Sequence, residues 1–238
     1  MTNPSVRIRS ACADDIPFLV ESVMNAERGH IGLGWWDLAF PRQAVITELL
    51  LTDKPACYRM DGFLIAEYPD GRRAGTILGC DLCSSSVPHT STSRTWEAQA
   101  EAVQCAVMKH LNVEEMAHVV DVIQVLSSAT PEYPGRCWLI DCVYVVPEFR
   151  GRGLADLLFR QSLARGSELG LPEARLITYS GNDASLRVYT RLGFETVTVG
   201  TNPEFVRRWQ GRTTGFMSMR LAGCRPTPPK PTPAVAAV

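Results

Sequence analysis

The sequence predicts a single α/β domain built around a central mixed sheet. Apolar segments of strand length alternate with segments whose apolar residues recur at helical spacing. The chain has 238 residues, of which 45% are hydrophobic and 21% are charged, as is usual for a globular protein. We expect one domain over residues 1–223 and a proline-rich, disordered tail over residues 224–238.

The N-terminal half is expected to contribute strands, helices and one hairpin. A short strand at 6–9 precedes a helix that starts at Asp14 and carries apolar residues at helical spacing. A glycine-rich and aromatic segment at 29–36 is predicted to be a loop, and 43–51 a helix. Segments 63–68 and 74–82 are predicted to form a hairpin, because the residues between them, Pro69 to Arg72, have turn chemistry.

Two further helices, at 96–108 and 113–126, are predicted to form an insertion at about 94–127. A polar, serine-rich loop at 84–93 precedes it. The acidic residues of the insertion are expected to form a solvated face: Glu97, Glu101, Glu114 and Glu115.

Composition argues against several classes of protein. The formal net charge is −1, so no long-range field favours nucleic acid or a membrane surface. No segment approaches the ~20 apolar residues that span a bilayer, and the N-terminus does not resemble a secretory signal. The 8 cysteines are scattered, mostly in apolar segments, and are expected to be reduced in a cytoplasmic protein. Cys80 and Cys83 form a CxxC without a second ligand pair, so they are expected to be buried in a strand, and no metal site is predicted.

Residues 138–155 carry the clearest chemical signal. A buried strand ends at Pro147, and the turn 150–155, Arg-Gly-Arg-Gly-Leu-Ala, leads into an amphipathic helix. Glycines allow a ligand to approach the main chain, and the first N–H groups of a helix lack partners within it. Together with Arg150 and Arg152, these groups predict a site for a diphosphate. A dinucleotide fold and a P-loop are excluded, because the third glycine position is Asp156 and no Gly-Lys-Ser/Thr triplet occurs.

A second element follows about 30 residues later. A strand at 174–179 leads to Asn182 and to a helix that ends in Tyr189-Thr-Arg-Leu-Gly-Phe194. The Arg-x-x-Gly-x-Ala turn and this element, in this order, resemble the GNAT superfamily of N-acetyltransferases. The close resemblance covers residues 137–197, with a looser match in the first strand and helix, the hairpin and a final strand near 214–221. It implies a mostly antiparallel sheet flanked by helices and acetyl-CoA as the cosubstrate.

The resemblance also implies a role for each matching residue. The main chain at Val143, Tyr144 and Val145 would pair with the pantetheine arm. Asn182 would contact the cofactor near that arm, and Tyr189 would protonate the leaving thiolate. The diphosphate would be held by Arg150 and by the amides of the turn: Gly151, Arg152, Gly153, Leu154 and Ala155.

The base that deprotonates the acceptor amine is less defined. Asp141 lies in the apolar strand beside the proposed pantetheine site, two residues before Val143, so the two side chains are expected to share a face. Two alternatives stay open: Asp141 is a structural carboxylate bonded to nearby main chain, or a water chain takes the place of a dedicated base. Glu67 and Asp81 are weaker candidates on the hairpin.

The acceptor is expected to be a primary amine of a small molecule or a peptide. Trp35 and Trp36 either line its pocket or pack under the insertion, and the insertion either covers the pocket or forms a homodimer surface. Two other functions stay open. One is a non-catalytic acyl-CoA-binding or sensing domain, which would not need Tyr189, and the other is an interaction module built on the insertion and the tail.

Overall fold

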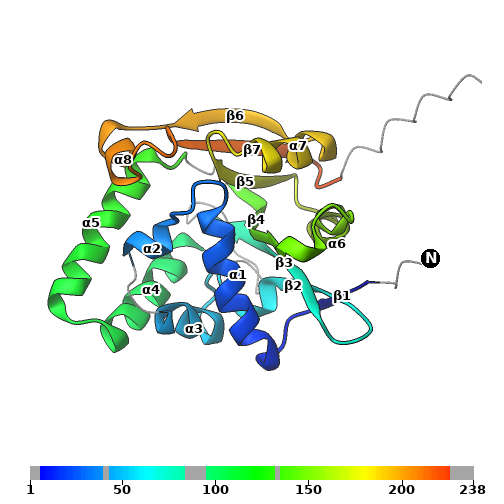
Figure 1. The fold of residues 1–238 in the computed structure, drawn as a ribbon, viewed down its shortest axis with the longest axis horizontal. Coiled ribbons are helices and arrows are strands. Elements are labelled where there is room, and N and C mark those ends of the chain that lie inside the picture. Colours follow the sequence, from blue (N-terminus) through cyan, green and yellow to red (C-terminus); the bar gives the residue numbers. More distant parts are fainter. Residues whose placement is uncertain (1–5, 40–42, 84–94, 132–134, 226–238) are drawn as a thin grey trace, which may run out of the picture.

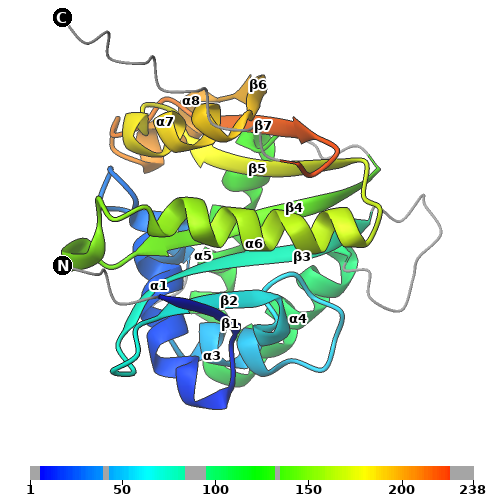
Figure 2. The ribbon, with the colours of Figure 1, turned by 90° about the vertical axis from the view of Figure 1, so that its right-hand side faces the viewer.

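The computed structural model describes residues 6–39, 43–83, 95–131 and 135–225. Its strands form one 7-stranded sheet in the order β1-β2-β3-β4-β5-β7-β6, which Figure 2 shows from bottom to top. Neighbouring strands are antiparallel except β4 and β5, which are parallel. The prediction of a mixed, mostly antiparallel sheet is therefore confirmed. The strands are β1 (Arg7–Ser10), β2 (Phe63–Glu67), β3 (Arg73–Cys83), β4 (Arg136–Val145), β5 (Glu173–Tyr179), β6 (Glu195–Gly200) and β7 (Phe216–Ala222).

Helices cover both faces of this sheet. In Figure 2, α6 crosses in front of β3 and β4, whereas α1 and the helices near it lie behind the sheet. Each face has its own apolar core, one shared with α1 and α3 and the other with α6 and α7. The helices are α1 (Ile16–Arg28), α2 (Trp35–Ala39), α3 (Ala44–Leu51), α4 (Trp96–His110), α5 (Val113–Ala129), α6 (Leu154–Glu168), α7 (Asp183–Leu192) and α8 (Pro203–Arg208).

The two helices of the insertion form as predicted and join the α1 side of the molecule. Asn112 starts α5 with a capping box, in which its side chain accepts from the Glu115 amide and Glu115 accepts from the Asn112 amide. In Figure 1, α4 lies beside α3 and α5 beside α2, and buried residues such as Ala106 and Val119 complete the first core. The insertion therefore packs against α2 and α3.

Two segments differ from the sequence prediction. The predicted loop 29–36 ends early, because Trp35 and Trp36 begin α2. Asp37 accepts a hydrogen bond from the Gly34 amide (3.0 Å) and pairs with Arg28 (2.6 Å), which fixes this helical turn. Cys224, assigned to the tail, is buried in the second core at 1% exposure. The predicted loop 84–93 and residues 226–238 of the tail lie outside the described residues.

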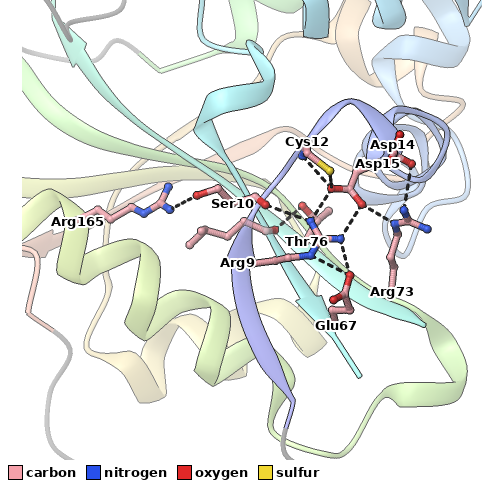
Figure 3. A network of polar contacts seen from close by, with 10 residues as sticks. Arg9, Ser10, Cys12, Asp14, Asp15, Glu67, Arg73, Thr76 and Arg165 are labelled. Carbon is pink, nitrogen blue, oxygen red and sulfur yellow. Dashed lines mark hydrogen bonds and ion pairs between the residues drawn. The ribbon is translucent and has the colours of Figure 1, made fainter. Parts of the chain in front are cut away.

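A polar network fixes the N-terminal end of α1 to the sheet (Figure 3). Asp15 is fully buried and accepts bidentate hydrogen bonds from Arg9 (2.6 and 2.9 Å), and Arg73 donates to it as well (2.5 Å). Arg9 also bonds Glu67 on β2 (2.8 Å). Because charge-assisted bidentate pairs have a defined geometry, the network holds the start of α1 against β1 and β3.

Candidate functional site

The parallel strands β4 and β5 separate toward their C-terminal ends. Their pairing covers only Trp138–Ala174 and Leu139–Arg175, although β4 continues to Val145 and β5 to Tyr179. Beyond this point β4 stays paired with β3 alone and β5 with β7. We call the space between residues 140–145 and 176–179 the β4–β5 opening. An extended ligand arm could hydrogen-bond there to strand edges, as peptides do when they add to a sheet.

A β-bulge interrupts β4 at the opening. Leu78 pairs with Asp141 and Thr76 with Tyr144, so Ile77 alone faces Cys142 and Val143. Cys142 has a φ of 47°, a backbone conformation that residues other than glycine rarely adopt. Such a conformation costs about 1–3 kcal/mol of strain. The bulge bends the strand and interrupts its ladder of main-chain hydrogen bonds beside Val143.

The bulge overturns one expectation about Asp141. The expectation that the side chains of Asp141 and Val143 share one face of β4 is wrong. Cys142 packs in the first core with Leu139, whereas Val143 packs against the second core. The extra residue reverses the alternation, so Asp141 faces α1 and Val143 faces α6.

The turn that follows β4 is open. Gly151 and Gly153 have φ values of 75° and 76°, and a Cβ added at either position would meet no atom within 4 Å. No side chain caps Gly153 at the start of α6, so the amides of the first turn have no side-chain partner at that cap. This geometry fits a diphosphate against the main chain at the positions that the sequence predicts.

The two arginines of the turn lie on its flanks. The Arg150 Nε atom donates to the Val145 carbonyl (3.0 Å), and its guanidinium lies over the Tyr144 ring (6.0 Å). Arg152 donates to the Glu148 carbonyl (3.1 Å) and lies over Phe149 (5.4 Å). Both are exposed, so they can add positive charge beside a phosphate without filling the turn.

Asn182 and Tyr189 come together on α7. Asn182 caps this helix by accepting from the Ser185 amide (3.4 Å), and its Nδ2 atom donates to the Thr178 hydroxyl (3.3 Å). Burial raises the pKa of Tyr189 to about 12, and hydrogen bonds with Ser185 and Thr178 oppose the rise. Because Thr178 belongs to the free end of β5, the Tyr189 hydroxyl lies at the β5 side of the opening and is protonated at neutral pH.

Asp141 lies at the β4 side of the opening. Its Oδ2 atom accepts from the Tyr58 hydroxyl (2.9 Å), and its Oδ1 atom accepts from the Cys142 amide (2.6 Å). Burial raises the pKa of Asp141, and these hydrogen bonds oppose the rise. The negative charge of Asp141 also contributes to the raised pKa of Tyr189, so the two side chains lie within electrostatic range of each other.

Glu27 is a further residue of the site and is absent from the sequence prediction. It lies on α1 and is half-buried, and its carboxyl oxygen is within 4.8 Å of ligand atoms of both Asp141 and Cys142. The pKa of Glu27 is raised well above its usual range, first by burial and then by the charge of Asp141. A signal was present in the sequence, because Glu27 extends the apolar stripe of Val20, Val23 and Met24 by one turn.

Glu67 and Asp81, the weaker candidates for the base, lie elsewhere. Glu67 is bonded to Arg9 in the network of Figure 3. Asp81 is 2% exposed and pairs with Arg136 at the start of β4 (2.5 Å), where β4 and β5 are still adjacent. Both carboxylates are therefore neutralised by an arginine away from the opening.

The two tryptophans line the first core beneath Tyr58. Trp36 is 0% exposed, and its ring meets the Tyr58 ring edge-on with 5.5 Å between the ring centroids. Trp35 is half-buried, and its ring centroid lies 3.9 Å from that of Trp36. The Trp35 main chain also hydrogen-bonds Tyr179. Trp36 can thus support the ring that holds Asp141, and Trp35 is the more accessible of the pair.

The described residues contain one group of side chains with the proximity of metal ligands, formed by Glu27, Asp141 and Cys142. Cys80 and Cys83 are both buried in β3, as the sequence predicts. Burial raises the pKa of Cys142 as well, which disfavours the thiolate that a nucleophile would need. No helix in the described part of the chain combines the length and apolar character needed to cross a membrane.

Comparison with known proteins agrees with this geometry. The family model described as "Acetyltransferase (GNAT) family" matches residues 105–194. An N-acetyltransferase from Staphylococcus aureus Mu50 has 15% identity and a TM-score of 0.57, over 90% of this chain and 100% of that one. A mutant spermidine N-acetyltransferase from Vibrio cholerae has 14% identity and a TM-score of 0.53, over 93% and 95%. A mutant agmatine N-acetyltransferase also has 14% identity and a TM-score of 0.53, over 91% and 99%.

At these identities the solved structures show a shared fold alone, and the comparison with curated proteins gave no match. The family match, in contrast, covers the end of β4, the glycine turn, α6 and α7, which are the elements that form the opening. The chain therefore resembles the GNAT acetyltransferase family over residues 105–194 and shares the fold of solved N-acetyltransferases.

Proposed function

We propose that this chain is an acetyl-CoA-dependent N-acetyltransferase that moves the acetyl group directly from the CoA thioester to a primary amine. One observation carries the proposal. Asp141 on β4 lies within electrostatic range of Tyr189, which hydrogen-bonds Thr178 on β5, and the open turn at 150–155 follows β4. A domain that only bound acyl-CoA would need the turn but not this pair.

Binding would use main-chain groups first. The amides from Gly151 to Ala155, with Arg150 and Arg152, are suited to the diphosphate. The edge of β4 at Val143, Tyr144 and Val145 is left without a β5 partner and is suited to the amides of the pantetheine arm. Asn182, fixed by its cap of α7, would contact the same arm.

The Asp141 carboxyl group and the Tyr189 phenol would carry out the proton transfers. Asp141 accepts one proton from the acceptor ammonium, which leaves a neutral amine to attack the thioester carbon. The C–N bond forms and the C–S bond breaks. Because a phenol of pKa about 12 is a weaker acid than a thiol, Tyr189 acts as a relay: it donates to the sulfur while it takes the second proton from the nitrogen. The Val143 amide, beside the bulge, would hold the oxyanion.

The acceptor is proposed to be a small amine. The structural relatives named above are described as acting on spermidine and agmatine, both of which carry primary amines. A peptide amine remains the other acceptor class that the sequence supports.

An acetyl-CoA consumption assay over a panel of amines, amino acids and peptides tests the proposal. We expect acetyl-CoA to be consumed with at least one primary amine, with matching formation of its N-acetyl product by mass spectrometry. Acetyl-CoA binding without product from any member of a broad panel would favour the non-catalytic alternative.

A further inference from the structure

We infer that Glu27 acts with Asp141 as a paired carboxyl site that holds one shared proton and exchanges it for the ammonium group of the acceptor. The inference rests on the proposed function and narrows its substrate class to amines that arrive as cations. It also adds Glu27 as a specificity-determining residue of the site.

The geometry brings these two groups together from distant parts of the chain. Glu27 belongs to α1 and Asp141 to β4, yet their carboxyl oxygens lie within 4.8 Å of each other. Each carboxyl group has a tyrosine hydroxyl as a hydrogen-bond partner: Tyr58 donates to Asp141, and Tyr179 hydrogen-bonds Glu27. Gly34 closes over Glu27 so tightly that a Cβ there would lie 2.8 Å from the Glu27 Cβ. The pair is thus held in place by three other segments of the chain.

Among the residues that the structure describes, no arginine compensates this pair as one does each of the other buried carboxyl groups. Asp15 and Asp81 are each bonded to an arginine, whereas the adjacent Arg28 is turned to Asp37 (2.6 Å). The groups that influence the pKa of Glu27 are Asp141 and Tyr179, and neither is a cation. Two like charges at this distance in a half-buried site are costly, so one of the carboxyl groups keeps a proton.

The other titratable groups around the pair, within the described ranges, are neutral near pH 7. They are Tyr58 before β2, Tyr179 on β5, Tyr189 on α7 and Cys142 on β4, and burial raises the pKa of each of them. The site therefore presents a net charge of −1 when one proton is shared, or −2 when it is released. An ammonium group that enters takes the place of that proton and restores the charge balance.

This exchange has a chemical consequence. The shared proton passes to water when the ammonium binds, and Asp141 is then free to accept a proton from the bound nitrogen. A neutral hydroxyl compound cannot replace the proton, and a carboxylate beside the reacting amine would be repelled. The site therefore selects an alkylammonium with no acidic group next to it.

The shared proton can be measured without knowing the acceptor. In a 13C NMR titration of the full chain, we expect the Glu27–Asp141 pair to lose its last proton well above the usual pH range of a carboxyl group. Glu27→Gln should leave a single carboxyl group that ionises at lower pH, and the control Glu21→Gln, at an exposed position of the same helix, should keep the high step. Carboxyl groups that are both ionised at pH 6 in the unmodified chain would overturn the inference.

Methylammonium chloride, compared with sodium chloride, tests the exchange itself. We expect methylammonium to move the high step to lower pH in the unmodified chain and in Glu21→Gln. An unchanged step in saturating methylammonium would refute ammonium binding at the pair.

Kinetics separate this inference from the proposed function. For any amine that is acetylated, Glu27→Gln should lower kcat/KM at pH 7 by ~10-fold or more and leave the affinity for CoA unchanged. Unchanged kcat/KM would remove Glu27 from the site while acetyl transfer stands. A high carboxyl step without turnover of any amine would instead refute acetyl transfer and leave the pair intact.

Discussion

The Tyr58 hydroxyl and the Asp141 carboxylate form a 2.9 Å hydrogen bond between residues 83 positions apart. Tyr58 precedes β2, and Asp141 lies directly before the bulge of β4. Trp36 packs edge-on against the Tyr58 ring, which limits its movement. The bond therefore holds the proposed base at the β4 side of the opening.

Tyr58→Phe is expected to shift the pH dependence of acetyl transfer. The bond from Tyr58 stabilises the ionised form of Asp141, so its loss raises the pKa of Asp141 further. The acidic limb of the kcat/KM profile should move to higher pH, while the calorimetric affinity for CoA stays the same. An unmoved limb would indicate that another group accepts the proton.

Tyr189→Phe is expected to lower kcat by ~10²-fold, because it removes the proton relay to the leaving sulfur. The ring contacts with Phe159 and Phe194 survive the change, so CoA binding should be nearly unaffected. Steady-state kinetics and a CoA titration measure both quantities. Full turnover in the variant would exclude Tyr189 from the mechanism.

Asp15→Asn is expected to reduce the free energy of unfolding by about 3 kcal/mol, because it leaves Arg9 and Arg73 facing a neutral group in a buried site. Asp14→Asn is the matched control, since Asp14 is exposed and offers only its carbonyl to Arg73. Urea unfolding of both variants measures the difference. Equal stabilities would show that the network of Figure 3 contributes little.

The same network predicts a pH dependence of stability. Burial opposes the ionisation of Asp15, but the hydrogen bonds from Arg9 and Arg73 outweigh it, so its pKa lies below the usual range. A depressed carboxyl pKa contributes stability that is complete above the unfolded pKa of about 3.9 and is lost as the pH falls further. Stability measured from pH 6 to pH 2 should therefore fall less steeply in Asp15→Asn than in the unmodified chain.

The local elements of the fold could be predicted because their signals are local. Apolar spacing identified α1 and α6, and the turn after Tyr68 identified the hairpin. Helix α8 was missed although its signals were present: Asn202 caps it by accepting from the Phe205 amide (2.6 Å), and Pro203 occupies its first turn. A short helix has too few apolar residues to show a period.

The site was predictable only where a motif is continuous in sequence. Residues 150–155 form one turn, so their open geometry agrees with their glycines. The carboxyl pair and its tyrosine come from three separate segments: Glu27 from α1, Tyr58 from the residues before β2, and Asp141 from β4. No spacing in the sequence connects these segments. The bulge at Cys142 is a further example, because it reverses the faces of Asp141 and Val143 without a glycine or proline to mark it.

The most direct test of the account is a calorimetric titration of acetyl-CoA into the unmodified chain, Gly153→Trp and Gly170→Trp. Both glycines have positive φ and open space around the Cβ position, so both variants carry similar backbone strain. Gly170 follows α6, far along the helix from the proposed diphosphate turn. We predict that Gly153→Trp loses acetyl-CoA binding while Gly170→Trp retains it. Equal, normal affinity in both variants would contradict the assignment of the diphosphate to the turn at 150–155.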